Sequence, residues 1–282
     1  MGFEMKNCFV DSRLARLARL SLLVLLAITL NLVSAQLMAQ EATPKQKPQT
    51  KKQDKQAKKS DSKKTAKKPK KVRPEFAAVE DVAGLPRVLL IGDSISIGYT
   101  LQVRKGLKGK ANVHRPPTNC GPTTRGLQGI EKWLGDKKWD VIHCNWRLHD
   151  LKYMGPNNEN LADPTNDKNH QQVPPAEYDK NLRKLVERLK KTDAKLIWRN
   201  TTPVPQGAQG RVVGDSAKYT VIAATIMKEH EIEIHDMFGL VKPKMAELML
   251  PKGDVHFKKP GSQVLADDTV KVVLAALQPA EK

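Results

Sequence analysis

Ser94 is the first residue of the chain whose side chain is placed where it could act as a nucleophile. It follows the apolar segment 87–91 and the pair Gly92-Asp93. The segment 87–91 predicts a buried strand, and a helix is expected after Ser94. The hydroxyl would then lie near a helix N-terminus, whose amide groups favour developing negative charge. Ser94 is therefore a candidate nucleophile. Serine is also a common helix N-cap, and for an isolated Gly-Asp-Ser capping is the ordinary explanation.

A second pair of reactive side chains, Asp254 and His256, lies near the end of the chain. A serine hydroxyl needs a base to accept its proton, and the base needs a partner that holds its tautomer. With one residue between them on a predicted loop, the Asp254 carboxylate is close enough to reach Nδ1 of His256. Nε2 is then free to face Ser94. Taken alone, His256 would be an incidental histidine of a surface loop.

Short β-branched segments alternate with helical patterns over the same part of the chain. The leucine and valine spacing of residues 176–191 is typical of an amphipathic helix. Strands are predicted at 87–91, 111–114, 140–146, 195–200 and 232–235, and helices after residue 94 and at 126–134, 176–191, 215–230 and 263–277. This alternation predicts an α/β fold with a parallel sheet covered on both faces.

In such sheets the reacting residues lie in loops beyond the carboxyl ends of the strands, which is where Ser94 and His256 fall. Residues 152–175 are a long stretch rich in Asn and Pro between two predicted elements. Loops of this length are often functional. The stretch is expected to be either a surface excursion or a lid or wall of the substrate site.

Residues 86–278 resemble the SGNH, or GDSL-type, hydrolase family. Its four sequence blocks are matched in order by Gly92-Asp93-Ser94-Ile95, Asn119-Cys120-Gly121, Arg147-Leu148-His149-Asp150 and Asp254-Val255-His256-Phe257. The resemblance implies a three-layer α/β/α sandwich of flavodoxin-like type, with a central parallel five-stranded sheet. The sequence lacks the Gly-x-Ser-x-Gly motif of the commoner α/β-hydrolases.

The same resemblance implies a role for each matched residue. Ser94 would attack an ester carbonyl, His256 would relay the proton, and Asp254 would orient His256. The backbone amides of Ser94 and Gly121 would bind the oxyanion. The resemblance implies no metal and no organic cofactor.

The third block departs from the family pattern, in which an asparagine side chain completes the oxyanion hole. His149 occupies that position here, and Arg147 stands where glycine is usual. His149 can donate one N–H because a neutral imidazole always has a donor nitrogen. Asn145 is the other candidate, and the sequence leaves the choice open. The acid–base block also has one residue between Asp and His, where the family often has two.

The net charge of +19 on 282 residues is concentrated near the N-terminus. Residues 41–74 hold fourteen Lys or Arg against three Asp or Glu and no Leu, Ile, Phe, Trp or Tyr. A segment with so little to bury is expected to be a disordered Lys-rich linker. It would serve as a spacer, or would bind an anionic cell-surface polymer or lipid. Residues 75–282 form the predicted hydrolase domain, and they show no nucleic-acid-binding signature.

Residues 1–40 have the pattern of a secretory signal peptide. Three arginines precede an uncharged apolar run, and Val33-Ser34-Ala35 resembles a cleavage site. The run is nearly long enough for an uncleaved membrane anchor, which is the alternative. Either way the protein is expected to be exported, and thus periplasmic, secreted or membrane-anchored.

Export permits a disulfide between Cys120 and Cys144, whose segments the predicted fold brings together. The alternative is two buried free thiols. Trp146 also has two interpretations, because an aromatic ring at the end of the third strand either packs in the core or stacks on a sugar. The sequence does not decide between them.

The leading expectation is thus an exported serine esterase that removes short acyl groups from carbohydrate. Its substrate would be a small-molecule or polysaccharide ester. The carbohydrate part rests on family analogy. Two alternatives are a non-catalytic domain that binds a glycan or cell surface, and an acyltransferase that uses the same three residues.

Overall fold

The computed structural model describes residues 72–278, and nearly all of the predicted hydrolase domain falls within this range. The predicted signal peptide or anchor at residues 1–40 lies outside the described residues, as does the Lys-rich linker up to residue 71.

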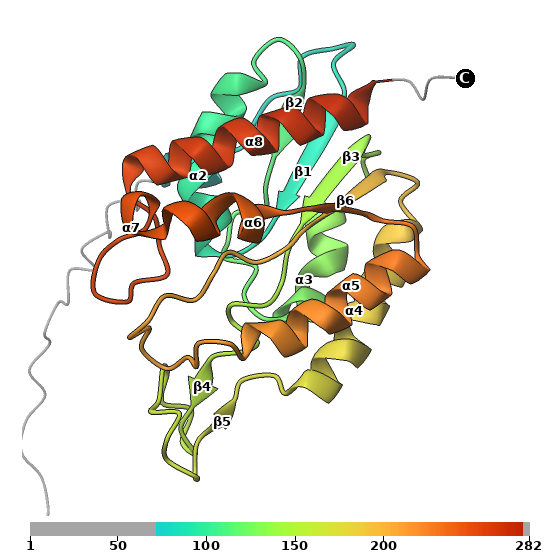
Figure 1. The fold of residues 1–282 in the computed structure, drawn as a ribbon. Helices are drawn as coiled ribbons and strands as arrows, with labels where there is room; N and C mark the ends of the chain where they lie inside the picture. Colours follow the sequence, from blue (N-terminus) through green and yellow to red (C-terminus); the bar gives the residue numbers. More distant parts are fainter. Residues whose placement is uncertain (1–71, 279–282) are drawn as a thin grey trace, which may run out of the picture. The chain divides into compact units, whose positions relative to one another are not determined.

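A five-stranded sheet forms the centre of the domain (Figure 1). Its strands are β1 (Arg87–Ile91), β2 (Asn112–His114), β3 (Val141–Cys144), β6 (Lys195–Arg199) and β7 (Glu233–His235). They lie side by side in the order β2-β1-β3-β6-β7, and every pairing is parallel. Leu89, for example, pairs with His114 on one side and Ile142 on the other. Strands β1 and β3 are almost completely buried, which explains their continuous apolar sequence.

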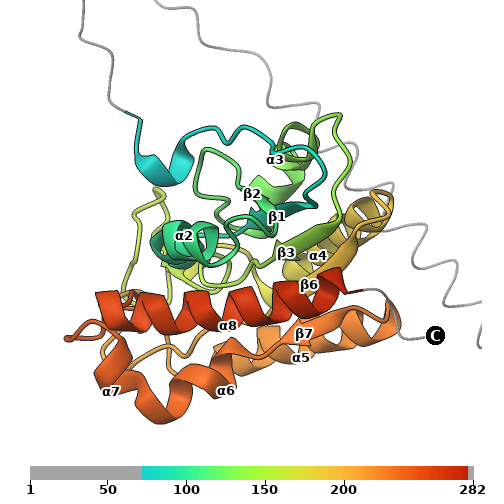
Figure 2. The same ribbon diagram turned by 90° about the horizontal axis from the view of Figure 1, so that it is seen from above.

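Helices cover both faces of this sheet. The longer ones are α2 (Ser94–Gly106), α3 (Thr123–Leu134), α4 (Pro175–Lys190), α5 (Ser216–Glu229) and α8 (Lys259–Leu277). Helices α2 and α8 pack together on one face, whereas α3, α4 and α5 form a row on the other (Figures 1 and 2). The three-layer α/β/α sandwich predicted from the sequence is therefore confirmed. No helix within residues 72–278 is both long and apolar enough to cross a membrane.

The predicted elements match the structure with small shifts at their ends. The third strand was expected to continue to residue 146 but ends at Cys144, although the Asn145 amide still donates to the Ile91 carbonyl at 3.1 Å. The final helix begins at Lys259 rather than at residue 263, with a proline in its first turn. Four short elements had no sequence signal: η1 (Pro74–Phe76), α6 (Met237–Val241), η2 (Lys242–Lys244) and α7 (Met245–Leu248).

The long stretch at 152–175 contains a two-stranded antiparallel pair, β4 (Tyr153–Met154) and β5 (His170–Gln171). It is tied to the rest of the domain by the Tyr153 amide, which donates to the Gly210 carbonyl at 2.8 Å. Three of its residues, Lys152, Asn160 and Leu161, line a pocket at the sheet edge. Of the two expectations for this stretch, the wall of a site is the one that the structure supports.

A buried carboxyl group, Asp150, connects the loop after β3 to the start of α3. Its Oδ1 accepts hydrogen bonds from the Thr123 amide at 2.8 Å and from the Thr123 hydroxyl at 2.6 Å. The N-cap residue of α3, Pro122, supplies no capping side chain, so Asp150 takes over that function. Burial raises the pKa of Asp150 to about 7, although the Thr123 hydrogen bonds oppose the shift.

Because the folded-state pKa of Asp150 lies above its ordinary value, the unfolded chain ionises first as the pH rises. The carboxyl therefore makes folding less favourable as the pH rises from about 4 to about 7. Asp150→Asn keeps an acceptor oxygen for Thr123 and cannot ionise. We predict that its unfolding free energy rises relative to that of the wild type by up to roughly 4 kcal/mol between pH 4.5 and pH 8.

Urea unfolding of the full chain at several pH values measures this difference. The matched control is Asp136→Asn, because Asp136 is exposed. A stability difference for Asp150→Asn that is constant across the pH range would contradict the prediction.

Candidate active site

Ser94 is the first residue of α2 and lies directly beyond the carboxyl end of β1. The preceding residue, Asp93, is the N-cap of this helix, and its Oδ1 accepts from the Ile95 amide at 3.0 Å. The turn needs glycine at position 92, because a Cβ there would lie 2.8 Å from Ser96 Oγ. Ser94 thus has its hydroxyl at the sheet edge and its own amide in the first turn of a helix, where helix amides have no intrahelical partner.

Two buried arginines, Arg199 and Arg115, contact the turn at residues 92–93 from the protein interior. Arg199, at the end of β6, is 1% exposed and places a guanidinium nitrogen 3.7 Å from Asp93 Oδ1. Arg115 donates to the Gly92 carbonyl at 3.3 Å and to Thr100 Oγ1 at 2.7 Å. The Asp93 carboxylate is itself only 3% exposed, so its charge is compensated inside the protein by Arg199.

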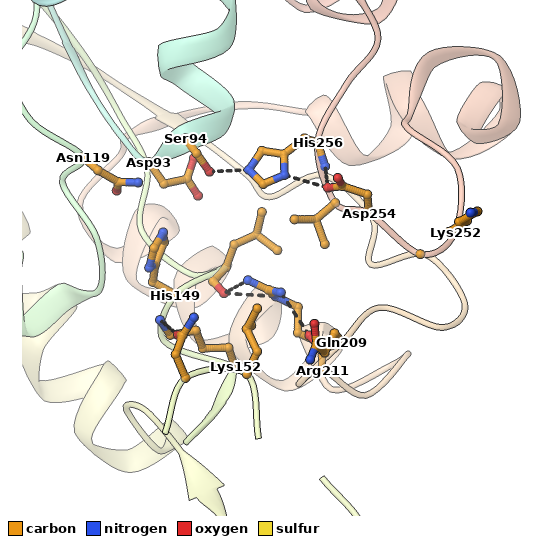
Figure 3. A pocket seen from close by; sticks show the side chains of 15 residues that line it. Asp93, Ser94, Asn119, His149, Lys152, Gln209, Arg211, Lys252, Asp254 and His256 are labelled. Atoms are coloured by element: carbon orange, nitrogen blue, oxygen red, sulfur yellow. Dashed lines mark hydrogen bonds and ion pairs between the residues drawn. The ribbon is translucent and has the colours of Figure 1, made fainter. Parts of the chain in front are cut away.

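His256 and Asp254 approach Ser94 from the loop that precedes α8 (Figure 3). Nε2 of His256 lies 2.9 Å from Ser94 Oγ, and Nδ1 lies 2.6 Å from Asp254 Oδ1. The same carboxylate oxygen accepts from the His256 amide at 2.9 Å, so Asp254 fixes both the backbone and the ring of His256. A single intervening residue is therefore sufficient for the carboxylate to reach the ring.

The charge state of Asp254 follows from its neighbours. Burial acts to raise its pKa, but hydrogen bonds from His256 and the positive charges of His256 and Arg211 outweigh that effect. The pKa of Asp254 is lowered as a result, and the group is a carboxylate at neutral pH. Both side chains remain open to solvent, with 46% of His256 and 44% of Asp254 exposed.

The two backbone amides expected to face an oxyanion differ in the structure. The Ser94 amide has no hydrogen-bond partner among residues 72–278. The Gly121 amide instead donates to Oδ1 of Asn119 at 2.9 Å, so the structure does not leave it available as predicted. Asn119 itself lines the pocket (Figure 3), and its Nδ2 has no partner within the described residues. The amide group of Asn119 is thus a candidate donor that the sequence did not single out, although it belongs to the second matched block.

The structure places Asn145 and His149 in different surroundings. Asn145 is 1% exposed, and its Nδ2 donates to the Arg199 carbonyl at 2.6 Å and to Thr201 Oγ1 at 3.2 Å. With both N–H groups used in the interior, Asn145 cannot serve the oxyanion, and that expectation is corrected. His149 lines the pocket. Burial lowers its pKa to about 4, with the charge of Asp93 opposing the shift, so the ring is neutral at pH 7 and carries one N–H donor.

Ser94 and His256 open onto a pocket of about 450 Å³ (Figure 3). Its walls come from the β1–α2 turn, the loop after β3, the 152–175 stretch, the chain after β6 and the loop before α8. The lining residues are Asp93, Ser94, Asn119, Leu148, His149, Lys152, Asn160, Leu161, Gln209, Arg211, Lys252, Gly253, Asp254, Val255 and His256.

Several of these residues had no sequence signal, because loops 148–161 and 205–211 have no periodic pattern. Lys152, Gln209 and Arg211 are the clearest cases. Conversely, Trp146 is 1% exposed and stacks on Trp198 at 6.4 Å between ring centroids, so it is a core residue.

Cys120 and Cys144 are both buried free thiols, so the disulfide interpretation is wrong. Within residues 72–278, no three His, Cys, Asp or Glu side chains lie together as a metal ion would require.

Comparison with known proteins identifies the fold. No protein-family model matches this sequence, and no curated protein matches it. Among solved structures, a lipase/acylhydrolase from Enterococcus faecalis aligns with a TM-score of 0.55 and 17% identity, covering 70% of this chain and 100% of its own. An acetylxylan esterase from Geobacillus stearothermophilus aligns with a TM-score of 0.53 and 18% identity, covering 66% of this chain and 93% of its own. The chain therefore has the fold of the SGNH-type hydrolases, as the sequence resemblance predicted.

The pairing of Arg199 with Asp93 gives a stability prediction. Arg199→Met keeps most of the side-chain length but leaves a buried carboxylate without its cation. We predict a loss of about 3–5 kcal/mol in unfolding free energy at pH 7. In the double variant that adds Asp93→Asn, part of this loss is regained because the unpaired charge is gone.

Guanidinium unfolding monitored by circular dichroism measures both variants. Lys195→Met is the matched control, since Lys195 begins the same strand and is exposed. An Arg199→Met protein within 0.5 kcal/mol of the wild type would show that Asp93 does not depend on this cation.

Proposed function

We propose that this protein is a serine ester hydrolase in which Ser94, His256 and Asp254 form a catalytic triad. The observation that supports the proposal most directly is the pair of contacts of 2.9 Å and 2.6 Å that join Ser94 Oγ, the His256 ring and Asp254 Oδ1. The contacts join side chains 162 residues apart in the chain and lie in a pocket. A helix cap or an incidental surface histidine requires neither feature.

The proposed reaction begins with attack of Ser94 Oγ on the ester carbonyl carbon, while the hydroxyl proton moves to His256 Nε2. The new C–O bond converts the carbonyl oxygen to an oxyanion. When this intermediate collapses, the bond to the alcohol oxygen breaks, and the proton on Nε2 passes to the departing alcohol. Water then repeats the sequence on the acyl-serine and releases the acid. Asp254, as a carboxylate, stabilises the imidazolium that forms in each half-reaction.

The oxyanion is proposed to bind three donors: the Ser94 amide, Nδ2 of Asn119 and the N–H of His149. Each lacks another hydrogen-bond partner within residues 72–278, and the Asn119 and His149 side chains line the pocket. A neutral His149 donates without adding a charge that must later be removed. Preorganised donors of this kind supply a large share of the rate enhancement in acyl transfer.

The acyl group is proposed to be as small as acetyl. Leu148, Leu161 and Val255 are the apolar side chains of the pocket lining, and the other twelve lining residues offer polar groups or glycine backbone. A long acyl chain would need more apolar surface than these three side chains provide. The alcohol is proposed to be a carbohydrate, by analogy with the acetylxylan esterase that shares the fold.

Export of the enzyme, through a signal peptide or anchor at residues 1–40, belongs to the same proposal. So does attachment of residues 41–74 to an anionic cell-surface polymer or lipid. Both rest on the sequence pattern described above.

The proposal predicts that the full chain hydrolyses nitrophenyl acetate faster than nitrophenyl octanoate. It also predicts that Ser94→Ala lowers kcat by at least about a thousandfold, because the nucleophile is lost. A fluorophosphonate probe should label the wild type and leave Ser94→Ala unlabelled. A preference for octanoate would overturn the proposed acyl size. A folded wild type that neither reacts with the probe nor turns over ester would favour the non-catalytic glycan-binding domain.

The oxyanion donors are tested by paired variants of Asn119. Asn119→Asp keeps an acceptor for the Gly121 amide but removes the Nδ2 donor, whereas Asn119→Ala frees the Gly121 amide. We predict that both variants, and His149→Phe, lower kcat for nitrophenyl acetate by about 100- to 1,000-fold with little change in KM. Full activity in Asn119→Ala alone would instead identify Gly121 as the donor. Asn157→Asp, an exposed change at a residue outside the pocket lining, is the control.

A further inference from the structure

One wall of the pocket carries positive charge that the proposed triad does not use. Lys152 and Arg211 both line it, whereas Lys252 lines the pocket beside Asp254 (Figure 3). Lys152 is only 8% exposed, and its Nζ donates to the side-chain oxygen of Asn160 at 2.7 Å. Arg211 donates twice to the Leu148 carbonyl at 3.3 Å and once to the Gln209 carbonyl at 3.3 Å. Every one of these acceptors is neutral.

Such an arrangement of cations is electrostatically unfavourable. Burial lowers the pKa of Lys152 and the charge of Arg211 lowers it further, whereas Asp150 opposes the shift through space without forming an ion pair with Lys152. Burial also lowers the pKa of Arg211. Two partly desolvated cations beside each other therefore lack the carboxylate partner that buried charges usually have, at least within residues 72–278. An ammonium group has three N–H donors, and Lys152 uses one of them in the contact with Asn160.

The two carboxylates of the pocket have other partners. Asp93 is next to Arg199 and caps α2, and Asp254 is bonded to His256. They attract Arg211 through space, but neither forms an ion pair with Lys152 or Arg211.

Arg115 is a cation with a purely structural role, and it differs from Lys152 and Arg211. Its partners are also neutral, but it makes five hydrogen bonds to the protein and lines no part of this pocket. The Lys152–Arg211 wall retains donors that face the pocket instead.

We propose that this wall binds an anionic group, a carboxylate or a sulfate, on the alcohol part of the substrate. This inference rests on the proposed function, because an acetyl group carries no charge and the anion must then belong to the alcohol. An anion between Lys152 and Arg211 would supply the missing countercharge and use their remaining donors, through charge-assisted hydrogen bonds. The substrate class is thus an O-acetylated acidic carbohydrate, such as a uronic acid ester, in preference to a neutral one.

Binding and turnover are measured on the full chain with three acetylated sugars of equal size. They are the O-acetylated methyl glycoside of glucuronic acid with its carboxylate free, the corresponding glucuronamide glycoside, and the acetylated methyl glucoside 6-sulfate. Titration calorimetry with Ser94→Ala gives binding without hydrolysis, and the wild type gives kcat and KM. We expect the glucuronate or the sulfate to bind at least about tenfold more tightly than the amide, with the difference reduced in 0.5 M salt. Whichever of the two binds more tightly identifies the anion.

Lys152→Gln and Arg211→Gln should each reduce this preference by about tenfold and leave the amide unaffected. Lys228→Gln removes the same charge from the exposed side of α5 and should change nothing. Thermal unfolding checks that each variant is folded, and the salt dependence of the wild type tests the inference even if a variant fails to fold.

Equal binding of the amide and both anions overturns the inference, whether or not the protein hydrolyses esters. So does a preference for the anions that survives in both Gln variants. Selective binding of the anions without any hydrolysis would support anion binding by Lys152 and Arg211 but would contradict the proposed esterase activity. The two proposals can therefore fail independently.

Discussion

Asp93 is the residue on which the geometry of the site depends most. Its carboxylate is nearly inaccessible to water, accepts from the first turn of α2 and is neutralised by Arg199 from the end of β6. The chain leaving β1 must therefore turn at Gly92 and enter the helix with Ser94 at its first position. Because Arg199 also donates to Asn145 after β3, the ends of three neighbouring strands are fixed by one network. The position of the Ser94 hydroxyl follows from this network rather than from contacts made by Ser94.

The positive charges near the site fall into two groups with different contacts. Arg115 and Arg199 contact the chain around Asp93 and make it rigid. Lys152 and Arg211 come from loops, contact neutral oxygens and face open space. Buried contacts therefore hold the turn that carries Ser94, and the two cations of the neighbouring wall contact only neutral oxygens. Preorganisation of this kind reduces the cost of aligning groups at the moment of reaction.

The layered fold and the meeting of Ser94 with His256 were predictable from the sequence, because strand and helix periods alternate clearly and the motif residues fall after strands. The boundary of β3 and the short helices α6 and α7 were not, since segments of four or five residues carry too little periodicity. The surroundings of the proposed oxyanion donors were predicted only in part. Whether the Gly121 amide is free depends on the rotamer of Asn119, and the role of Asn145 depends on which way it points beyond β3. Neither property is encoded in residue type or spacing.

The positions of the two reacting side chains also affect how the protein matures. Ser94 opens α2, whereas His256 lies immediately before α8, the last helix, and α2 and α8 pack against each other. The two side chains meet across 162 positions of sequence, so their contact needs the final helix in place. A chain that ended before residue 256 would hold Ser94 without the imidazole that it contacts here. The contact between Ser94 and His256 therefore joins the beginning of the described fold to its end, and it cannot form before both parts have folded together.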